Sequence, residues 1–421
     1  MDETVFQVIQ LILLVLIFLS VSKPLTKKTR LILKRSVVVT IHFLSKLFPK
    51  SKNLIVFGGE SGNGFRGNTK YLFLEMNKND SLQCVWISKN QRVVNEINSL
   101  GYQAYKHHSI KGIINQLRAK VIVHSHSIND DFSKTFVGGA ISYNTWHGVG
   151  LKKVWGANKH TFSYKVIHDQ NRIRKFFAMF VVKANLTKKS YVVSTSESVS
   201  SYYPETFLVP RENVLELGQV RNDVFFMETE EDKLIPEWIR EGKIILYMPT
   251  HRSVGKFEKD ISLVFNFEKL NAFCEDNGYT FVFKRHMYSQ GNVPTSYSNI
   301  KDISEQSYDP QLLLKYTDIL ITDYSSCYTD YLLLDRPVLF FCYDIDLYLT
   351  KANQMYFNYF DVTPGPKAYQ FNELINYMKE SIEEPMKYQK DRSRVLDIFY
   401  SPENQQPVLQ KQVEYIEKYL L

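Results

Sequence analysis

Cysteine is scarce in this chain, which argues against a zinc-binding protein and against a protein stabilised by disulfides. Four cysteines occur among 421 residues, all in apolar stretches, and none has a second cysteine at the short spacing of a metal site. A content of 44% hydrophobic residues is enough to build a core without disulfides. The sequence therefore predicts a reduced protein with neither a zinc site nor a disulfide framework. The four residues are Cys84, Cys274, Cys327 and Cys342.

Signals for common ligands are missing as well. No pair of carboxylates has the spacing of a metal site, and the chain has no internal repeat and no low-complexity segment. Residues 58–68 are rich in glycine but lack the GxGxxG spacing of a dinucleotide-binding loop. The sequence thus predicts no metal and no cofactor. The loop is either a flexible turn or a site for an acceptor substrate, with four candidate residues: Glu60, Asn63, Arg66 and Asn68.

Negative charge is absent between residues 23 and 50. Eight basic residues lie in that segment, and the other 44 basic residues equal the 44 acidic ones of the chain. The segment is also rich in Leu, Ile, Val and Phe, and it follows an uncharged apolar run at residues 4–22. Basic residues interleaved with apolar ones favour anionic membrane lipid, and not nucleic acid, as the partner.

The apolar run at residues 4–22 is about long enough to cross the hydrocarbon of a bilayer. Acidic residues precede it and basic residues follow it, so the positive-inside rule predicts a body on the cytoplasmic face of the cell membrane. At residues 33–48 apolar side chains recur at helical spacing, which predicts an amphipathic helix lying on lipid. The alternative is a helix packed on the protein's own core. The polar side of this helix carries Lys34, Arg35, His42, Ser45 and Lys46.

Beyond residue 50, short apolar runs of strand length alternate with helix-like stretches. This pattern predicts an α/β protein whose parallel sheets are covered on both faces. A Glu-rich break at residues 226–241 divides the pattern, which predicts two doubly wound, Rossmann-like domains facing a cleft. The predicted strands are residues 54–57, 84–87, 121–123, 141–146, 191–193, 214–217, 244–247, 279–283, 319–321 and 338–341.

One of these runs ends at a candidate catalytic histidine. His147 precedes Gly148 and Gly150, and glycines let backbone N–H groups approach a ligand closely. Neutral imidazole accepts a proton near pH 7, so His147 is a candidate general base for a hydroxyl. Lys152 and Lys153 stand nearby to hold negative charge.

A second run ends at three groups that carry or can carry positive charge: Lys284, Arg285 and His286. Such groups would repel one another without an anion between them, so a diphosphate is the natural occupant. The alternative is an exposed basic turn.

A third run ends at Ser325 and Ser326, which would open a helix and offer hydroxyls and free backbone N–H groups to a phosphate. Asp330 follows on the same helical face, where it could accept hydrogen bonds from ligand hydroxyls. Helix capping alone would also explain the two serines.

These motifs and their order resemble the CDP-glycerol glycerophosphotransferase family of teichoic acid and related polymer synthesis. The resemblance spans roughly residues 140–345. Its motifs are 145–148 (Thr-Trp-His-Gly), 218–223 (Gly-Gln-Val-Arg-Asn-Asp), 248–252 (Met-Pro-Thr-His-Arg), 284–286 (Lys-Arg-His), 322–326 (Thr-Asp-Tyr-Ser-Ser) with Asp330, and 335–337 (Asp-Arg-Pro).

The resemblance implies a glycosyltransferase-B-like fold in which His147 is the base and His286 the second catalytic histidine. The implied parts are residues 1–50 as anchor and amphipathic helix, 51–225 as acceptor domain, 226–400 as CDP-polyol-binding domain, and 401–421 as a helix crossing back to the first domain. The implied donor-binding residues are Trp146, Gly148, Val149, Gly150, Arg221, Pro249, Thr250, Lys284, Arg285, Ser325, Ser326 and Asp330.

The implied reaction moves glycerol phosphate from CDP-glycerol to a hydroxyl of a polyprenyl-diphosphate-linked glycan and releases CMP, in teichoic acid or capsule polysaccharide synthesis. Many family members have Gly-Thr-Pro-Leu where this chain has 148–151, Gly-Val-Gly-Leu. The polyol therefore stays open between glycerol and ribitol. The sequence is also compatible with a nucleotide-sugar glycosyltransferase of the same fold and with a non-catalytic membrane-associated binding protein, and the oligomeric state is open.

Overall fold

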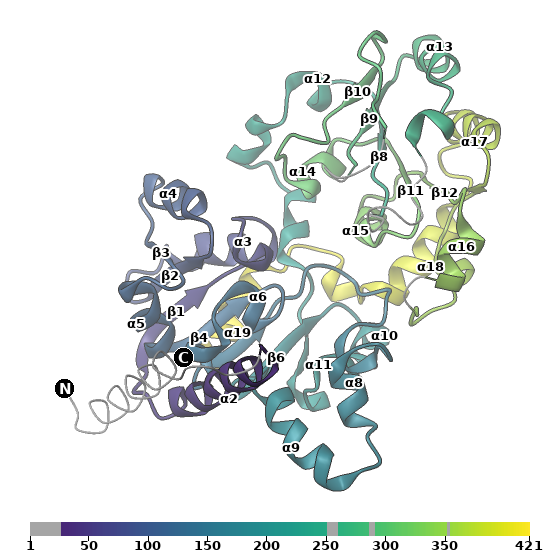
Figure 1. The fold of residues 1–421 in the computed structure, drawn as a ribbon. Coiled ribbons are helices and arrows are strands. Elements are labelled where there is room, and N and C mark those ends of the chain that lie inside the picture. The colour runs from purple at the N-terminus through teal and green to yellow at the C-terminus, as the bar shows by residue number, and fades with distance from the viewer. Residues whose placement is uncertain (1–26, 251–259, 286–290, 352–353) are drawn as a thin grey trace.

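The computed structural model of the protein describes residues 27–250, 260–285, 291–351 and 354–421 (Figure 1). It contains two parallel sheets, each with helices packed around it, so the predicted α/β architecture of two doubly wound domains is confirmed. The predicted anchor at residues 4–22 lies outside the described residues. Within the described ranges, no helix combines the length and the apolar character needed to cross a bilayer.

The first domain is built on a seven-stranded sheet in the order β3-β2-β1-β4-β5-β6-β7, with every paired strand parallel. The order reverses direction between β1 and β4, and ligands of such sheets bind beside the carboxyl ends of strands at that point. The strands are β1 (Ser51–Phe57), β2 (Gln83–Ser88), β3 (Ala104–Lys106), β4 (Ala119–His124), β5 (Ile141–Asn144), β6 (Lys189–Ser194) and β7 (Val214–Glu216).

The second domain repeats this plan with six strands in the order β10-β9-β8-β11-β12-β13. Its central strands are continuous buried apolar runs, as expected for a sheet covered on both faces. The strands are β8 (Ile244–Tyr247), β9 (Thr280–Phe283), β10 (Ile300–Asp302), β11 (Ile319–Thr322), β12 (Val338–Phe341) and β13 (Lys367–Ala368).

Helices connect the strands in both domains. Those of the first domain are α2 (Lys27–Ser45), α3 (Gly67–Met76), α4 (Gln91–Ser99), α5 (Ile110–Arg118), α6 (Ile128–Asp131), α7 (Lys134–Val137), α8 (Phe162–Ile167), α9 (Arg172–Lys183), α10 (Glu197–Ser200) and α11 (Tyr203–Phe207). Those that follow are α12 (Glu237–Arg240), α13 (Phe267–Asn277), α14 (Pro310–Lys315), α15 (Cys327–Tyr331), α16 (Ile345–Lys351), α17 (Phe371–Glu383), α18 (Gln389–Phe399) and α19 (Leu409–Tyr419).

The C-terminal end of α2 packs on the first domain and not on lipid. His42 and Ser45, predicted to lie on its polar side, are both buried. His42 Nδ1 is 2.7 Å from the carbonyl oxygen of Lys134, and Ser45 Oγ accepts a hydrogen bond from the backbone N–H of Gly138 at 3.0 Å. At this end of the helix, the alternative of packing on the protein's own core is the correct one.

The chain returns to the first domain after α18, and α19 lies beside α3 (Figure 1). Asp223, just after β7, fixes the start of this last helix: its carboxylate accepts hydrogen bonds from the backbone N–H groups of Val408 and Leu409 at 2.8–3.0 Å. Asp223 is buried, so these bonds replace its contacts with water.

We predict that Asp223→Ala lowers the free energy of unfolding by about 1–3 kcal/mol, because two buried N–H groups lose a charged acceptor. Urea denaturation followed by fluorescence measures the change. Glu414→Ala, which removes an exposed carboxylate from α19, is the matched control and leaves the midpoint nearly unchanged. An equal effect of the two substitutions would contradict the role given to Asp223.

Candidate active site

A pocket of about 260 Å³ lies between the two domains, where the carboxyl ends of β5, β8 and β11 face each other. The segments that follow these three strands form its wall, as the positions of the predicted motifs required. The predicted residues that line it are Trp146, His147, Gly148, Val149, Gly150, Pro249, Thr250, Ser325 and Ser326; Leu151, Lys152, Val154 and Tyr324 line it as well.

A tight turn after β5 places His147 in this pocket. Trp146 adopts a positive φ of 54°, which is uncommon for a residue with a side chain, and two asparagines hold it there. Asn144 Oδ1 accepts from the Trp146 N–H, and Asn68 Nδ2 donates to the Trp146 carbonyl, each at 2.9 Å. Gly148 is required because a side chain at this position would stand 2.6 Å from Nη2 of Arg221.

The hydrogen bond of His147 determines which of its nitrogens can act as a base. Its Nδ1 lies 3.0 Å from the carbonyl oxygen of Ser125. A carbonyl only accepts, so Nδ1 carries the proton and Nε2 keeps its lone pair. His147 is an exposed residue, so a hydroxyl can reach this lone pair.

His126 belongs to this site, although the sequence analysis did not select it. Its ring stacks on that of His147, with centroids 4.3 Å apart and planes inclined by 12°. Buried Asp131 fixes the segment, because its Oδ2 accepts from the backbone N–H groups of Ser125 and His126 at 2.8 Å. His126 follows β4, a central strand next to β5, and its place after a strand end was the signal that could have identified it.

The surroundings of His147 keep the ring neutral. Removal from water, the adjacent His126 ring and the positive charge of Arg221 lower the pKa of His147 from its ordinary value of 6.5, against the bond to Ser125, which raises it. Because the ring keeps an exposed edge, water offsets part of this shift. The direction of the shift still leaves an unprotonated imidazole at pH 7, as a general base requires.

Arg221 and Asp330 form an ion pair beneath the pocket. Asp330 is completely buried and also accepts hydrogen bonds from Asn222, Gln311 and Tyr400. Its carboxylate, predicted to bind ligand hydroxyls, therefore faces protein donors and does not line the pocket. In this arrangement Asp330 orients Arg221 toward the turn at Gly148.

Lys284 and Arg285 follow β9, and neither lines the pocket. Lys284 Nζ donates to the carbonyl oxygen of Gln306 at 2.8 Å, while burial and the nearby Arg66 lower its pKa. Arg285 Nη2 lies 3.0 Å from Asp302 Oδ2. His286, predicted as the second catalytic histidine, lies outside the described residues.

Buried Asp323 joins two segments of the pocket wall. Its Oδ1 accepts a hydrogen bond from the backbone N–H of Thr250 at 2.7 Å, and its own backbone leads into Ser325. Ser326 immediately precedes α15, and its side chain makes no capping hydrogen bond to the helix. Ser325 and Ser326 thus line the same pocket as the turn of His147.

The glycine-rich loop contributes to the site indirectly. Asn68 is buried and accepts a hydrogen bond from the backbone N–H of Arg221 at 2.9 Å, so it positions the His147 turn and Arg221 together. Asn63 and Arg66 line a second cavity between the domains. Arg66 also pairs with Glu60 at 3.5 Å.

Metal ligation has no support among the residues that the structure describes, because no three His, Cys, Asp or Glu side chains gather there as a metal site requires.

Backbone contacts between the two domains lie next to the pocket. Lys152 of the first domain pairs with Met355 of the second in an isolated β-bridge, and the backbone N–H of Tyr356 donates to the Leu151 carbonyl at 2.9 Å.

Comparison with protein families agrees with this geometry. The model of the family described as CDP-Glycerol:Poly(glycerophosphate) glycerophosphotransferase matches residues 40–417, a range that includes both sheets and every segment of the pocket. The chain belongs to this family. Its resemblance at the motif level is therefore confirmed, and the protein is a member of an enzyme family of teichoic acid synthesis.

Relatives of this family include enzymes for both polyols. A teichoic acid poly(ribitol-phosphate) polymerase of Bacillus spizizenii is 30% identical over 403 residues, which cover 86% of this chain and 58% of the relative. A teichoic acid glycerol-phosphate transferase of Staphylococcus aureus is 26% identical over 386 residues, which cover 89% and 95%. The chain thus spans little more than half of the first relative.

A solved structure has the same fold. The wall teichoic acid polymerase TagF superimposes with a TM-score of 0.71 at 24% identity, and the match covers 93% of this chain and 95% of that one. At this level of identity the likeness establishes the fold alone, a glycosyltransferase-B-like arrangement of two α/β domains.

We predict that the His147 imidazole is the Nδ1–H tautomer and titrates below pH 6.5, since the groups around it favour the neutral form. Nitrogen-15 spectra of the histidine side chains between pH 4 and 8 test this, with exposed His168 as the reference signal. The signal of His147 is assigned from its loss in His147→Ala. A midpoint above 6.5, or an Nε2–H tautomer, would contradict the geometry.

Proposed function

We propose that the protein transfers glycerol phosphate or a related polyol phosphate from a CDP-polyol to a hydroxyl of a lipid-linked glycan and releases CMP. The observation that carries this proposal is the neutral His147, which keeps Nε2 free of the proton because Nδ1–H is held by the Ser125 carbonyl, and which lines one pocket with Ser325, Ser326 and Lys152. Family membership supports the donor class, and one solved structure of the TagF polymerase was soaked with CDPG.

His147 supplies the proton transfer in this mechanism. Nε2 removes the proton of the acceptor hydroxyl as its oxygen attacks the phosphorus that bears the polyol, and the bond from phosphorus to the CMP oxygen breaks. The resulting imidazolium is stabilised through Nδ1–H by the Ser125 carbonyl. Phosphoryl transfer otherwise depends on positioning and on compensation of negative charge, which the pocket wall can supply.

The cations of the second domain compensate the charge that develops on CMP. In this proposal Lys284 and Arg285 approach the diphosphate from β9, and His286 beside them acts as the second catalytic histidine. Arg221 adds positive charge from below Gly148. Because Lys284 and Arg285 contact Gln306 and Asp302 in the present structure, donor binding would exchange these contacts for phosphate oxygens.

The polyol of the donor stays open between glycerol and ribitol. Relatives of both kinds match the chain, and Val149 offers no hydroxyl to the donor. A nucleotide-sugar transferase of the same fold is the second candidate function, and the nucleotide that is released distinguishes it, since a sugar donor would release UDP or GDP.

We predict that wild-type protein releases CMP from CDP-glycerol or CDP-ribitol in the presence of a lipid-linked disaccharide, and that His147→Ala and His286→Ala each slow this release at least about 100-fold. Chromatography of the released nucleotide and mass analysis of the product measure both. His168→Ala replaces an exposed histidine away from the pocket and is the matched control. Release of UDP from a UDP-sugar, or a fully active His147→Ala variant, would refute the proposal.

Membrane association of this enzyme has support beyond the apolar run at residues 4–22. On α9, apolar side chains recur at helical spacing and remain 43–73% exposed: Ile173, Phe176, Phe177 and Phe180. Basic residues accompany them on the same helix: Arg172, Arg174, Lys175 and Lys183. Exposed aromatic rings beside basic groups are typical of helices that lie in the interface of an anionic bilayer.

The α9 surface and α2 lie on the same side of the first domain. Phe43 of α2 contacts Phe180 of α9, with ring centroids 6.2 Å apart, and both helices lie at the lower edge of the first domain in Figure 1. In this proposal the run at residues 4–22 anchors the chain, α9 rests on the lipid, and the body is on the cytoplasmic face. The pocket then meets acceptors held by a polyprenyl diphosphate in the synthesis of teichoic acid or capsule.

We predict that Phe176→Glu combined with Phe177→Glu weakens binding to vesicles containing phosphatidylglycerol by at least about tenfold, because two apolar anchors are lost and negative charge is added. Flotation of a protein lacking residues 1–26 isolates this surface. Leu263→Glu alters an apolar residue of the second domain that is at least as exposed, and it is the control. Unchanged flotation of the double variant would exclude α9 as the contact.

A further inference from the structure

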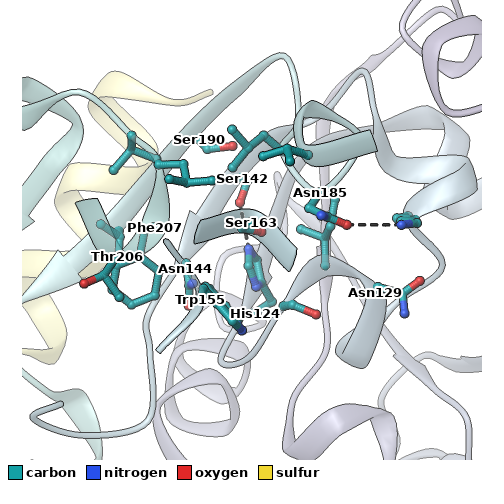
Figure 2. Close-up of a pocket in the computed structure, with 18 of the residues that line it drawn as sticks. His124, Asn129, Ser142, Asn144, Trp155, Ser163, Asn185, Ser190, Thr206 and Phe207 are labelled. Carbon is teal, nitrogen blue, oxygen red and sulfur yellow. Dashed lines mark hydrogen bonds between the residues drawn. The ribbon is translucent and has the colours of Figure 1, made fainter. Parts of the chain in front are cut away.

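A separate cavity of about 240 Å³ lies inside the first domain, lined by residues of β4, β5 and β6 and of the helices α8, α9 and α11 (Figure 2). Pockets for drug-sized ligands have volumes of roughly 300–1,000 Å³. This cavity is smaller, so it has room for only one small ligand group. Val182 and Asn185 at the end of α9 form part of its wall, so it lies directly behind the proposed membrane surface.

The chemistry of the wall excludes several ligands. No carboxylate lines the cavity, so a cation has no partner there. The single charged residue is Lys134, and its Nζ donates to Asn185 Oδ1 at 3.1 Å. Phosphate groups are usually held by several cations or by bidentate arginine, and the wall contains no arginine. A neutral polar ligand remains.

Amide and hydroxyl groups of the wall have hydrogen-bonding capacity left. The side-chain NH2 groups of Asn144 and Asn185 and the hydroxyl of Ser163 make no hydrogen bond to any residue that the structure describes. Asn185 is exposed and Ser163 is half-buried, so of the three residues only Asn144 is withdrawn from bulk water. Asn144, which lines the cavity, is 94% buried as a residue. His124 and Ser142 complete this polar wall through a 2.7 Å hydrogen bond (Figure 2).

Aromatic rings close the other side of the cavity. Trp155 and Phe207 meet edge to face with centroids 5.3 Å apart, and both contact Trp146 of the active-site turn. These three rings separate the cavity from the pocket of His147. Flat aromatic faces combined with amides and hydroxyls are suited to a sugar, which has an apolar ring face and a rim of hydroxyl groups.

We propose that this cavity binds one sugar unit of the glycan acceptor, the unit nearest to the lipid. The assignment to the acceptor rests on the proposed function. The cavity lies between α9, where the lipid would end, and the turn that carries His147, where the acceptor hydroxyl must arrive. A sugar held here fixes the distance from membrane to active site, so that the following unit of the chain passes around the aromatic rings into the pocket.

Direct binding tests the sugar site without any donor. The probe is octyl N-acetyl-β-D-glucosaminide below its micelle concentration, titrated into the full chain by calorimetry, and tetraethylene glycol monooctyl ether has the same tail without a sugar. We expect the glycoside to bind at least tenfold more tightly than the ether. Ser163→Trp and Asn185→Trp each fill the cavity and remove this difference, whereas Ser99→Trp on exposed α4 preserves it.

Kinetics then test the link to the acceptor. In Ser163→Trp and Asn185→Trp we expect the KM for a lipid-linked disaccharide to rise at least fivefold while the KM for the CDP-polyol stays unchanged. Equal binding of glycoside and ether, or tight glycoside binding by both tryptophan variants, would overturn the sugar site. If wild type binds the glycoside but releases no CMP from any donor, the proposed function fails and the acceptor assignment with it, while the sugar site stands.

Discussion

The buried ion pair of Arg221 and Asp330 holds the site together. Asp330 is a residue of α15 in the second domain, and Arg221 belongs to the segment that follows β7, the last strand of the first domain. The ion pair therefore crosses the boundary between the domains, where the pocket lies. A buried charge that loses its partner typically costs about 3–5 kcal/mol, which makes either residue hard to replace. Arg221 passes beneath Gly148, so this pair links the segment of Ser325 and Ser326, which leads into α15, to the turn that carries His147.

Hydrogen bonds to the backbone position the turn that carries Trp146 and His147. Asn68 and Asn144 hold Trp146 in its unusual conformation, and Ser125 fixes the tautomer of His147. Each of these polar groups is directed by a strand end or by the start of a helix. The reactive nitrogen is therefore positioned by rigid elements of the first domain, while the cations for a diphosphate come from the second. A CDP-polyol donor that contacts both domains would therefore meet the imidazole of the first domain and the cations of the second.

Much of this organisation could be predicted from the sequence. All ten predicted strands exist, because central parallel strands are continuous apolar runs that differ clearly from their surroundings. β3, β10 and β13 were not predicted, since edge strands of two or three residues bury too little to show a pattern. The motif residues after β5, β8 and β11 do meet in one pocket, as the topology of parallel sheets requires, whereas Lys284 and Arg285 after β9 do not line it.

What the sequence did not show depends on contacts between distant segments. Asp330 has the spacing of a ligand-binding residue, but the approach of Arg221 and Tyr400 decides what its carboxylate faces. His126 has no recognisable motif around it in the sequence, and its link to the site comes from the stacking of its ring on His147. His42 looked like part of a polar helix face until α7 covered it. In each case the deciding contact is made with another segment of the chain, and only for His126 did a local signal exist, its place just after a strand end.

The return of the chain to the first domain has a consequence for its biogenesis. Val413, Ile416 and Leu420 belong to the same apolar cluster as residues of β1, β2 and β4. During synthesis the ribosome releases these three residues long after the sheet that they cover. Part of the core of the first domain therefore stays exposed to water and to chaperones until residue 420 has left the ribosome. The second domain can fold before that moment.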